Sequence, residues 1–369
     1  MNFCIVLNYF SLIVIISFYA MDYFHSSTSQ AGLASSIFVI GTLVARFFCG
    51  RRIERIGRKR MLNTGLILSL VMTLLYFGVN SMVSLFVLRF VHGAAFGICG
   101  TATGTIVANI IPVERRGEGI GYYSLSVTLA AALGPFTSMF IAQHGSMNMI
   151  FMASAIPVAL SLVSALFLSA PEIELTEEQL QEMKEFKFNS FFEPKAIPIS
   201  IFGAVIYFCY SSILTFLTAY SKEINLVDAA SLFFVIFSVV VFVSRPFTGR
   251  WFDFKGENLT MYPAILIFAT GMLVFSQAHQ GSVLLLAAAI IGLGFGTIQS
   301  SSQAISIKVT PAHRMGLANS TFFMSVDAGI GIGPFILGML IPYTGYRGMY
   351  TVTAMVVLAC TLLYYLLHG

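Results

Sequence analysis

The sequence predicts an all-α membrane protein whose twelve transmembrane helices form two similar bundles of six. Three observations lead to this prediction. Only 10% of the 369 residues are charged and the mean hydropathy is +0.86, whereas about 25% of the residues in a soluble domain are charged. Apolar stretches of about 20 residues, long enough to cross a bilayer, recur along the whole chain. Short patterns of the first half also return in the second half at a constant offset of 199 residues.

The apolar stretches define the predicted spans. Each must be a helix, because backbone polar groups in lipid find partners only within their own segment. The first stretch has no basic leader and no cleavage signal, so we expect a membrane helix and not a removed signal peptide. Its shortness leaves room for an upstream segment. The predicted spans cover residues 2–22, 31–49, 61–79, 82–108, 117–141, 147–169, 198–220, 229–248, 260–278, 283–307, 317–341 and 347–367.

The repeat divides these spans into two halves. A duplication inside so apolar a chain is typical of transporters built from two similar halves. We expect an N-terminal bundle at 1–169, an acidic linker at 170–197 and a C-terminal bundle at 198–369. The clearest repeated pairs are Gly50 and Gly249, Gly57 and Gly256, Gly93 and Gly292, Gly117 and Gly316, and Gly134-Pro135 and Gly333-Pro334.

Basic residues are distributed unevenly among the predicted loops. Fifteen Lys and Arg lie in loops on one side of the membrane, against Lys222 and Arg347 on the other. Because cytoplasmic loops carry the excess of positive charge, both termini and the linker are predicted to be cytoplasmic, in the inner (cytoplasmic) membrane. The net charge of +4 reflects this orientation and not nucleic-acid binding.

Several function classes lack the residues that they need. The five Cys all lie in apolar runs without metal-ligand spacing, so we predict no metal site, no cofactor and no disulfide framework. The sequence has no Gly-x-x-x-x-Gly-Lys-Ser/Thr motif, which disfavours ATP-driven transport. It also shows no catalytic triad, so we do not predict an enzyme.

The loop after the second predicted span carries the pattern Gly50-x-x-x-Glu54-Arg55-x-Gly57-Arg58-Lys59. This pattern resembles the signature of the major facilitator superfamily, Gly-x-x-x-Asp-Arg-x-Gly-Arg-Lys, with Glu in place of Asp. A shorter form, Gly249-x-x-x-Asp253-x-x-Gly256, stands in the second half. Arg89-x-x-His92-Gly93 is similar to the family's Arg-x-x-Gln-Gly, and Gly134-Pro135 to the core of a motif associated with antiporters. The resemblance covers nearly the whole chain and looks closest to bacterial efflux proteins of the proton-antiporter type.

The resemblance implies that the loop after the second span is part of a gate. In the family, the acid at the position of Glu54 pairs with the other motif residues and latches the outward-facing state. The alternative is that this loop only sets the topology. Arg46 and Arg245 lie one turn before Gly50 and Gly249, and we group them with the gate. Alternatively, these two side chains snorkel to the cytoplasmic surface.

Proline inside a helix removes a backbone donor and clashes with the preceding turn. Pro135 and Pro334, with Gly134 and Gly333 before them, are therefore predicted to bend their helices.

Arg89 and His92 lie three residues apart within one predicted span and share a helix face. A guanidinium in lipid is costly unless it is paired or hydrated, so this face must look into protein or a wet cavity. We predict that Arg89 binds an anionic substrate group or tunes a proton site, and that His92 titrates near neutral pH. In the alternative, Arg89 binds helix-end carbonyls and His92 is a packed spacer.

Asp327 is the one carboxylate predicted deep in the membrane. Desolvation there would favour loading and release of a proton, so Asp327 is the first candidate for proton coupling. The alternatives are a structural pair with a neighbouring helix and a partner of the loop between the second and third helices. Asp22, at the outer end of the first span, is a further coupling candidate, or is simply solvated.

The family architecture implies a cavity lined by the first, fourth, seventh and tenth helices. The seventh span offers Tyr207 and Tyr210, and the tenth offers Gln299 and Gln303, one turn apart on one face. The chain contains 35 Phe and 15 Tyr, and a mostly apolar pocket with few charges suits amphipathic or lipophilic substrates.

These observations favour a secondary active transporter that works by alternating access. The leading hypothesis is proton-coupled efflux of small amphipathic compounds, whose partners are the substrate, protons and the lipid bilayer, by a chain that acts as a monomer. The first alternative is uptake or facilitated diffusion of a metabolite. The second is a membrane scaffold or sensor that transports nothing, although a scaffold has no need of a buried Arg89 or Asp327.

Overall fold

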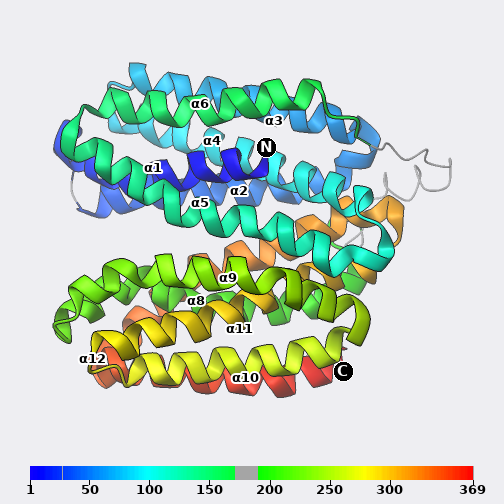
Figure 1. Cartoon of the computed structure of the whole chain (residues 1–369). Coiled ribbons are helices and arrows are strands. Elements are labelled where there is room, and N and C mark those ends of the chain that lie inside the picture. Colours follow the sequence, from blue (N-terminus) through cyan, green and yellow to red (C-terminus); the bar gives the residue numbers. More distant parts are fainter. Residues whose placement is uncertain (27, 171–189, 369) are drawn as a thin grey trace. The chain divides into compact units, whose positions relative to one another are not determined.

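The computed structural model describes residues 1–26, 28–170 and 190–368, and this part of the chain is helical and contains no strand (Figure 1). The helices are α1 (Asn2–Phe24), α2 (Thr28–Ile56), α3 (Arg58–Leu75), α4 (Met82–Ile110), α5 (Arg116–His144), α6 (Met147–Leu166), α8 (Ile197–Glu223), α9 (Val227–Lys255), α10 (Glu257–Ser276), α11 (Gly281–Lys308) and α12 (Met315–His368). Short 3-10 helices are η1 (Tyr76–Gly78), η2 (Val113–Arg115), η4 (Pro194–Ala196) and η5 (Ala312–Arg314).

The predicted spans agree with these helices. Ten helices of the described residues are long and apolar enough to cross a membrane, and α1, which is bent by 47°, adds an eleventh. The last of the ten, Ala312–His368, runs for 57 residues, long enough for two spans of about 20 residues each. Gly345 interrupts α12 with a φ of 66°, inside the gap predicted between the last two spans. The predicted all-α fold of twelve transmembrane helices is therefore confirmed.

The chain forms two compact units. Unit 1 comprises Met1–Ile110, Ser126–Glu193 and Pro311–Thr321. In it, α4 packs against α2 and α3, while α6 packs against α1 and α3. Its core includes the buried side chains of Leu12, Ile16, Tyr76 and Phe151.

Unit 2 comprises Ile111–Leu125, Pro194–Thr310 and Phe322–Gly369. Here α11 packs against α9 and α10, and this arrangement repeats the packing of α4 against α2 and α3. The duplicated sequence therefore produces the same helix packing in each half. The boundaries predicted at 1–169 and 198–369 stay predictions, and residues 171–189 of the predicted linker lie outside the described residues.

Glycines explain why these helix pairs approach so closely. A Cβ on Gly97 would lie 2.7 Å from the carbonyl oxygen of Thr42, and a Cβ on Gly292 would lie 2.8 Å from that of Phe237. Both distances are shorter than any real Cβ contact, so only glycine permits this packing.

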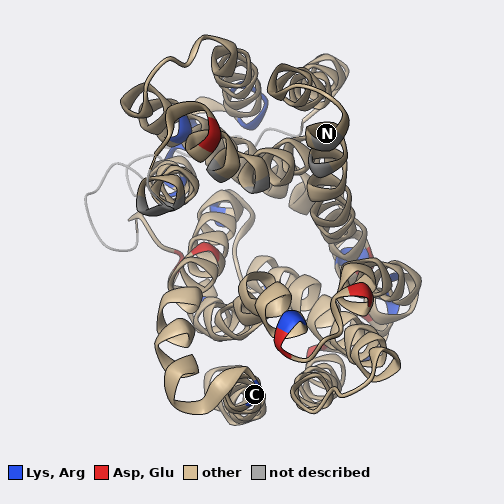
Figure 2. Ribbon diagram, turned by 90° about the vertical axis from the view of Figure 1, so that its left-hand side faces the viewer, with Lys and Arg blue, Asp and Glu red and all other residues tan. Residues whose placement is uncertain are grey.

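The surface is apolar over most of its length, and Figure 2 shows how sparse Lys, Arg, Asp and Glu are along the ribbon. Large side chains such as Phe136, Phe247 and Leu362 are exposed. Apolar surface on this scale is stable where lipid, and not water, is the solvent.

Candidate gating contacts and transport site

The end of α2 carries a buried ion pair. Arg58 donates from Nε and Nη2 to the two carboxylate oxygens of Glu54, each over 2.9 Å. The side chains of Arg58 and Glu54 are 0% and 1% exposed. A bidentate pair so fully withdrawn from solvent is rigid, and removal of either partner leaves a buried charge.

Gly57 and Gly256 lie in the turns that follow the motif acids Glu54 and Asp253. Gly57 precedes α3 with a φ of 98°, and Gly256 precedes α10 with a φ of 87°. Residues with a Cβ rarely adopt this backbone conformation. The glycine that follows each motif acid by three residues is therefore required by the turn.

In unit 1, the end of α2 packs tightly against the start of α12. A Cβ on Gly50 would lie 2.5 Å from both side-chain atoms of Ser320, and a Cβ on Gly316 would overlap the side chain of Ile53. The carboxylate of Glu54 is adjacent, 3.4 Å from the same position on Gly316. These residues form what we call the α2–α12 contact, in which two helix backbones meet across two glycines.

In unit 2, the end of α9 makes the equivalent contact with the start of α5. A Cβ on Gly249 would lie 2.7 Å from Cα of Glu118, and one on Gly117 would lie 2.7 Å from the carbonyl oxygen of Gly249. Asp253 accepts hydrogen bonds from the backbone N–H groups of Gly117 (2.7 Å) and Glu118 (3.0 Å). Asp253 therefore caps the N-terminus of α5, where unpaired amides and the helix dipole favour an anion. We call this set the α9–α5 contact.

Glu118 adds an ionic bridge to the α9–α5 contact. It accepts from Nη2 of Arg115 over 2.7 Å and from Nε of Arg250 over 3.3 Å. Both arginine side chains are largely exposed, at 65% and 60%. Sequence reasoning missed Glu118. The available signal was its position next to Gly117, which the repeat pairs with Gly316.

The two arginines that precede the motif glycines are buried. Arg46 is 4% exposed and Arg245 is 2% exposed. Nη1 of Arg245 donates to the carbonyl oxygen of Gly296 over 2.8 Å and to the hydroxyl of Ser300. The interpretation that these side chains snorkel to the surface is therefore wrong. Arg245 lies against the glycine-rich face of α11, where a carbonyl is within its reach.

The remaining basic residues of the first motif lie outside this core. Arg55 is exposed. Nζ of Lys59 donates to the carbonyl oxygen of Leu166, at the end of α6, over 3.3 Å. They are accessible positive charges beside the α2–α12 contact.

Arg89 and His92 lie inside unit 1, 0% and 1% exposed. Arg89 donates from Nε to the carbonyl oxygen of Ala34 (3.0 Å) and from Nη1 to the hydroxyl of Tyr76 (3.3 Å). Its guanidinium carbon also lies 4.4 Å from the ring centroid of Phe38, a cation–π distance. These partners satisfy much of the cation within the protein.

The ring of His92 lies between two hydroxyls. Nδ1 is 3.3 Å from Oη of Tyr76, and Nε2 is 3.3 Å from Oγ of Ser69. Which ring nitrogen donates depends on the tautomer, and each nitrogen has a hydroxyl that can donate or accept. A neutral imidazole satisfies this network.

The predicted cavity residues of the second half lie in unit 2. Tyr207 and Tyr210 are buried in α8, and their neighbour Phe295 of α11 stacks on Tyr210 with ring centroids 3.8 Å apart. Gln299 of α11 lies near Tyr207. The structure thus brings three of the predicted residues together.

Asp327 and Gln303 extend this cluster. Asp327 is half-buried in α12, and its carboxylate lies within electrostatic range of Tyr207. Gln303 is buried, and its amide oxygen accepts from Ser124 over 3.5 Å. Asp22 is not part of this cluster, because it is exposed near the end of α1 in unit 1.

The Gly-Pro pairs of α5 and α12 mark two more close helix contacts. A Cβ on Gly134 would lie 2.6 Å from Cβ of Phe10 in α1, and one on Gly333 would overlap the side chain of Ser211 in α8. Pro135 and Pro334 lie within their helices. The bends predicted from these prolines stay predictions.

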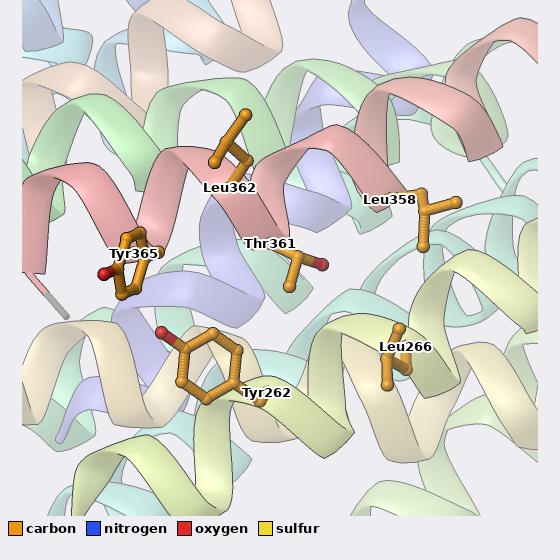
Figure 3. Close-up of a pocket in the computed structure, with 6 residues that line it drawn as sticks. All are labelled: Tyr262, Leu266, Leu358, Thr361, Leu362 and Tyr365. Carbon is orange, nitrogen blue, oxygen red and sulfur yellow. The ribbon is translucent and has the colours of Figure 1, made fainter.

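A groove of about 570 Å³ runs between α10 and the end of α12 (Figure 3). Its wall is apolar apart from three hydroxyls, and several of its side chains face outward, where lipid is expected. None of the predicted substrate residues lines it. The lining residues are Tyr262, Leu266, Leu358, Thr361, Leu362 and Tyr365.

Two duplicated helix contacts and twelve apolar spans are features of a membrane transporter with two related halves. The profile of the Major Facilitator Superfamily matches residues 1–324 and, separately, residues 199–368, so this chain belongs to that family.

Named relatives support the same class. The chain is 25% identical over 330 residues to multidrug resistance protein 1 of Bacillus subtilis, covering 87% of this chain and 82% of the relative. It is 25% identical over 344 residues to multidrug resistance protein MdtG of Klebsiella pneumoniae, covering 90% and 82%. The solved structure of the proton:xylose symporter XylE matches with a TM-score of 0.78 at 14% identity, over 100% of this chain and 94% of that chain. At this identity the structural likeness shows the fold alone.

Proposed function

We propose that this protein exports small amphipathic compounds in exchange for protons by alternating access. The observation that carries the proposal is the pair of equivalent contacts, α2–α12 and α9–α5. Each brings two helix ends together across glycines beside a motif acid, with no covalent link. Such a contact is rigid when formed and its charges are hydrated when it opens, which suits a gate with two discrete states.

Asp327 is the proposed proton carrier. It is half-buried within a span, and it lies near Tyr207, which in turn lies near Gln299. A carboxylate in such surroundings gains from protonation, because the neutral form needs less solvation. His92 is not proposed as a carrier, because the network of Ser69 and Tyr76 holds a neutral ring.

The side chains beside Asp327 favour amphipathic substrates. Tyr210 and Phe295 form a flat aromatic pair, and Gln299 and Gln303 supply amide groups on the same helix as Phe295. Flat apolar compounds with a few polar groups match this composition. The relatives named for multidrug resistance favour the same class, although their names describe those proteins.

The proposed setting is the cytoplasmic membrane, with both termini and the linker on the cytoplasmic side and the protein acting as a monomer. The basic residues of the first motif support this orientation through the positive-inside rule. A reporter enzyme fused after Gly369 should be active in the cytoplasm, and activity outside the cell would overturn the topology.

Transport in proteoliposomes tests the proposal. Purified protein is reconstituted with a panel of fluorescent amphipathic dyes and metabolites under an imposed pH gradient. We expect dye movement that depends on the gradient and stops when an ionophore collapses it. Asp327→Asn should abolish the dependence on the gradient, whereas His92→Gln, the residue that the family resemblance has there, should preserve it. Dye movement by Asp327→Asn with its full dependence on the gradient would remove Asp327 from the mechanism.

Uptake of a polar metabolite is the second candidate. The amides of Gln299 and Gln303 favour it, because such groups also bind hydroxyl-rich solutes. In the same panel, the protein is tested with sugars and other metabolites. If such a solute moves in the same direction as the protons and none of the dyes moves, uptake replaces export as the proposed function.

A further inference from the structure

The four residues Ser190–Glu193, which precede η4, lie against both sides of the α2–α12 contact. Phe191 is 6% exposed and covers α2. Its ring stacks on Phe47 with centroids 4.5 Å apart and planes 12° apart, and the guanidinium carbon of Arg51 lies 4.7 Å from its centroid. Phe47 and Arg51 are one turn apart on α2, so both contacts hold the ring against the same face of that helix.

Glu193 binds the other partner of the contact. Its backbone N–H donates to Oγ1 of Thr321 over 3.0 Å, and its carboxylate accepts from Nε of Arg314. The side chains of Glu193 and Arg314 are 3% and 12% exposed. An ion pair so far withdrawn from water holds the segment firmly to the start of α12.

We propose that Ser190–Glu193 is a strap that holds the α2–α12 contact closed, with Phe191 and Glu193 as further gating residues outside the duplicated motif. Phe191 packs against α2, and Glu193 binds η5 and α12. The two residues are so close in the chain that they span at most about 7 Å. If α2 and α12 separate by more than a few ångströms, either the packing of Phe191 on α2 or the binding of Glu193 to η5 and α12 must therefore break. This inference rests on the proposed function, because it assigns the strap to the proposed gate.

The strap also makes the two gates unequal. The duplication supplies an α2–α12 contact and an α9–α5 contact, but the segment that connects the two halves occurs once in the chain. Within the described part of that segment, Phe191 and Glu193 contact the two sides of the α2–α12 contact.

Hydrogen exchange of the reconstituted full-length chain tests the strap without any substrate. In Phe191→Ala and in Glu193→Gln we expect the amides of residues 47–56 and 315–321 to exchange about threefold faster or more, because the local opening that exposes them becomes easier. Phe192→Ala is the matched control, since Phe192 is less buried than Phe191 and meets Phe47 edge-on, with centroids 5.9 Å apart. Unchanged exchange in both strap variants, or equal acceleration in the control, would overturn the strap.

A charge exchange separates the ion pair from general damage. Glu193→Arg combined with Arg314→Glu should restore the slow exchange that Glu193→Gln loses, because the pair is rebuilt in reverse. Failure of the double variant to restore it would show that Glu193 does not act through Arg314.

The outcome for the strap is distinct from the outcome for the proposed function. If exchange changes as expected but no solute moves in proteoliposomes, the strap stands and the transport proposal fails. If solutes move and exchange is unchanged, the transport proposal stands and the strap fails.

Discussion

The α2–α12 contact and the α9–α5 contact descend from one duplicated pattern, yet their acids bind differently. Both use glycines to bring two helices together, at Gly50 and Gly316 in one and at Gly249 and Gly117 in the other. Glu54 pairs with the arginine four residues later, whereas Asp253 caps the amides at the start of α5.

A single residue explains this divergence. The offset of 199 places Glu257 where Arg58 stands in the first half. Asp253 therefore has an acid, and not a base, four residues later. Glu257 forms its ion pairs with Lys308, 3.4 Å away, and with His368. The backbone geometry of the duplication was retained while its ionic contacts changed.

The largest expected effect is loss of the buried pair at α2. Glu54→Ala removes the carboxylate that Arg58 binds with two hydrogen bonds in a buried site, which should destabilise the protein by about 3–5 kcal/mol. Thermal or chemical unfolding of the purified protein in detergent measures this. Asp253→Ala serves as the comparison and should lose clearly less. Equal losses in the two variants would mean that the two contacts do not differ energetically as their geometry indicates.

The second largest effect is expected at Gly57 and Gly256, which occupy equivalent turns in the two halves. Gly57→Ala and Gly256→Ala should each cost about 1–2 kcal/mol, because a Cβ strains a left-handed backbone. Nothing lies within 4 Å of a Cβ at Gly256, so its cost is that of the backbone alone. Gly78→Ala is the control, since a Cβ there also meets open space and its φ is not positive. If Gly78→Ala destabilises as much as Gly256→Ala, the backbone explanation fails.

Removal of the helix cap in unit 2 should have a smaller effect. Asp253→Ala deprives two amides of α5 of their acceptor, at a cost of about 1 kcal/mol. Hydrogen exchange at Gly117 and Glu118 should accelerate, while the amides of α2 should not respond. Unaltered protection of these two amides would show that the cap is not formed in the membrane.

The smallest effect is expected for the exposed arginines around Glu118. Arg250→Gln should change the free energy of unfolding by less than about 1 kcal/mol, because surface ion pairs are screened and their side chains are mobile. The same unfolding assay at low and high salt measures it. A loss as large as that of Glu54→Ala would indicate that Glu118 and Arg250 are buried in the functional state.

Much of the architecture follows from hydropathy and the internal repeat. Span lengths and the break at Gly345 are predictable because the bilayer imposes a helix of fixed minimum length. The packing glycines were also visible, since Gly93 and Gly97 return as Gly292 and Gly296.

The side-chain partners were less predictable, because they depend on which helix ends meet. Arg46 and Arg245 were placed near a surface by their position in sequence, yet a neighbouring glycine-rich helix buries them. Phe191 and Glu193 lie in a segment whose acidic composition indicated a solvated linker. The aromatic pair Phe191-Phe192, just before Glu193-Pro194, is the local sign that part of this segment is anchored.

One continuous helix carries both a gating contact and the proposed proton site. The first turns of α12 belong to unit 1 as far as Thr321, and the helix continues from Phe322 in unit 2. Asp327 follows Thr321 by six residues, about 9 Å along the axis. An α-helix is stiff over this distance. A change in the charge of Asp327 that moves its part of α12 would therefore move Thr321 as well, through the helix backbone and without a chain of side-chain contacts.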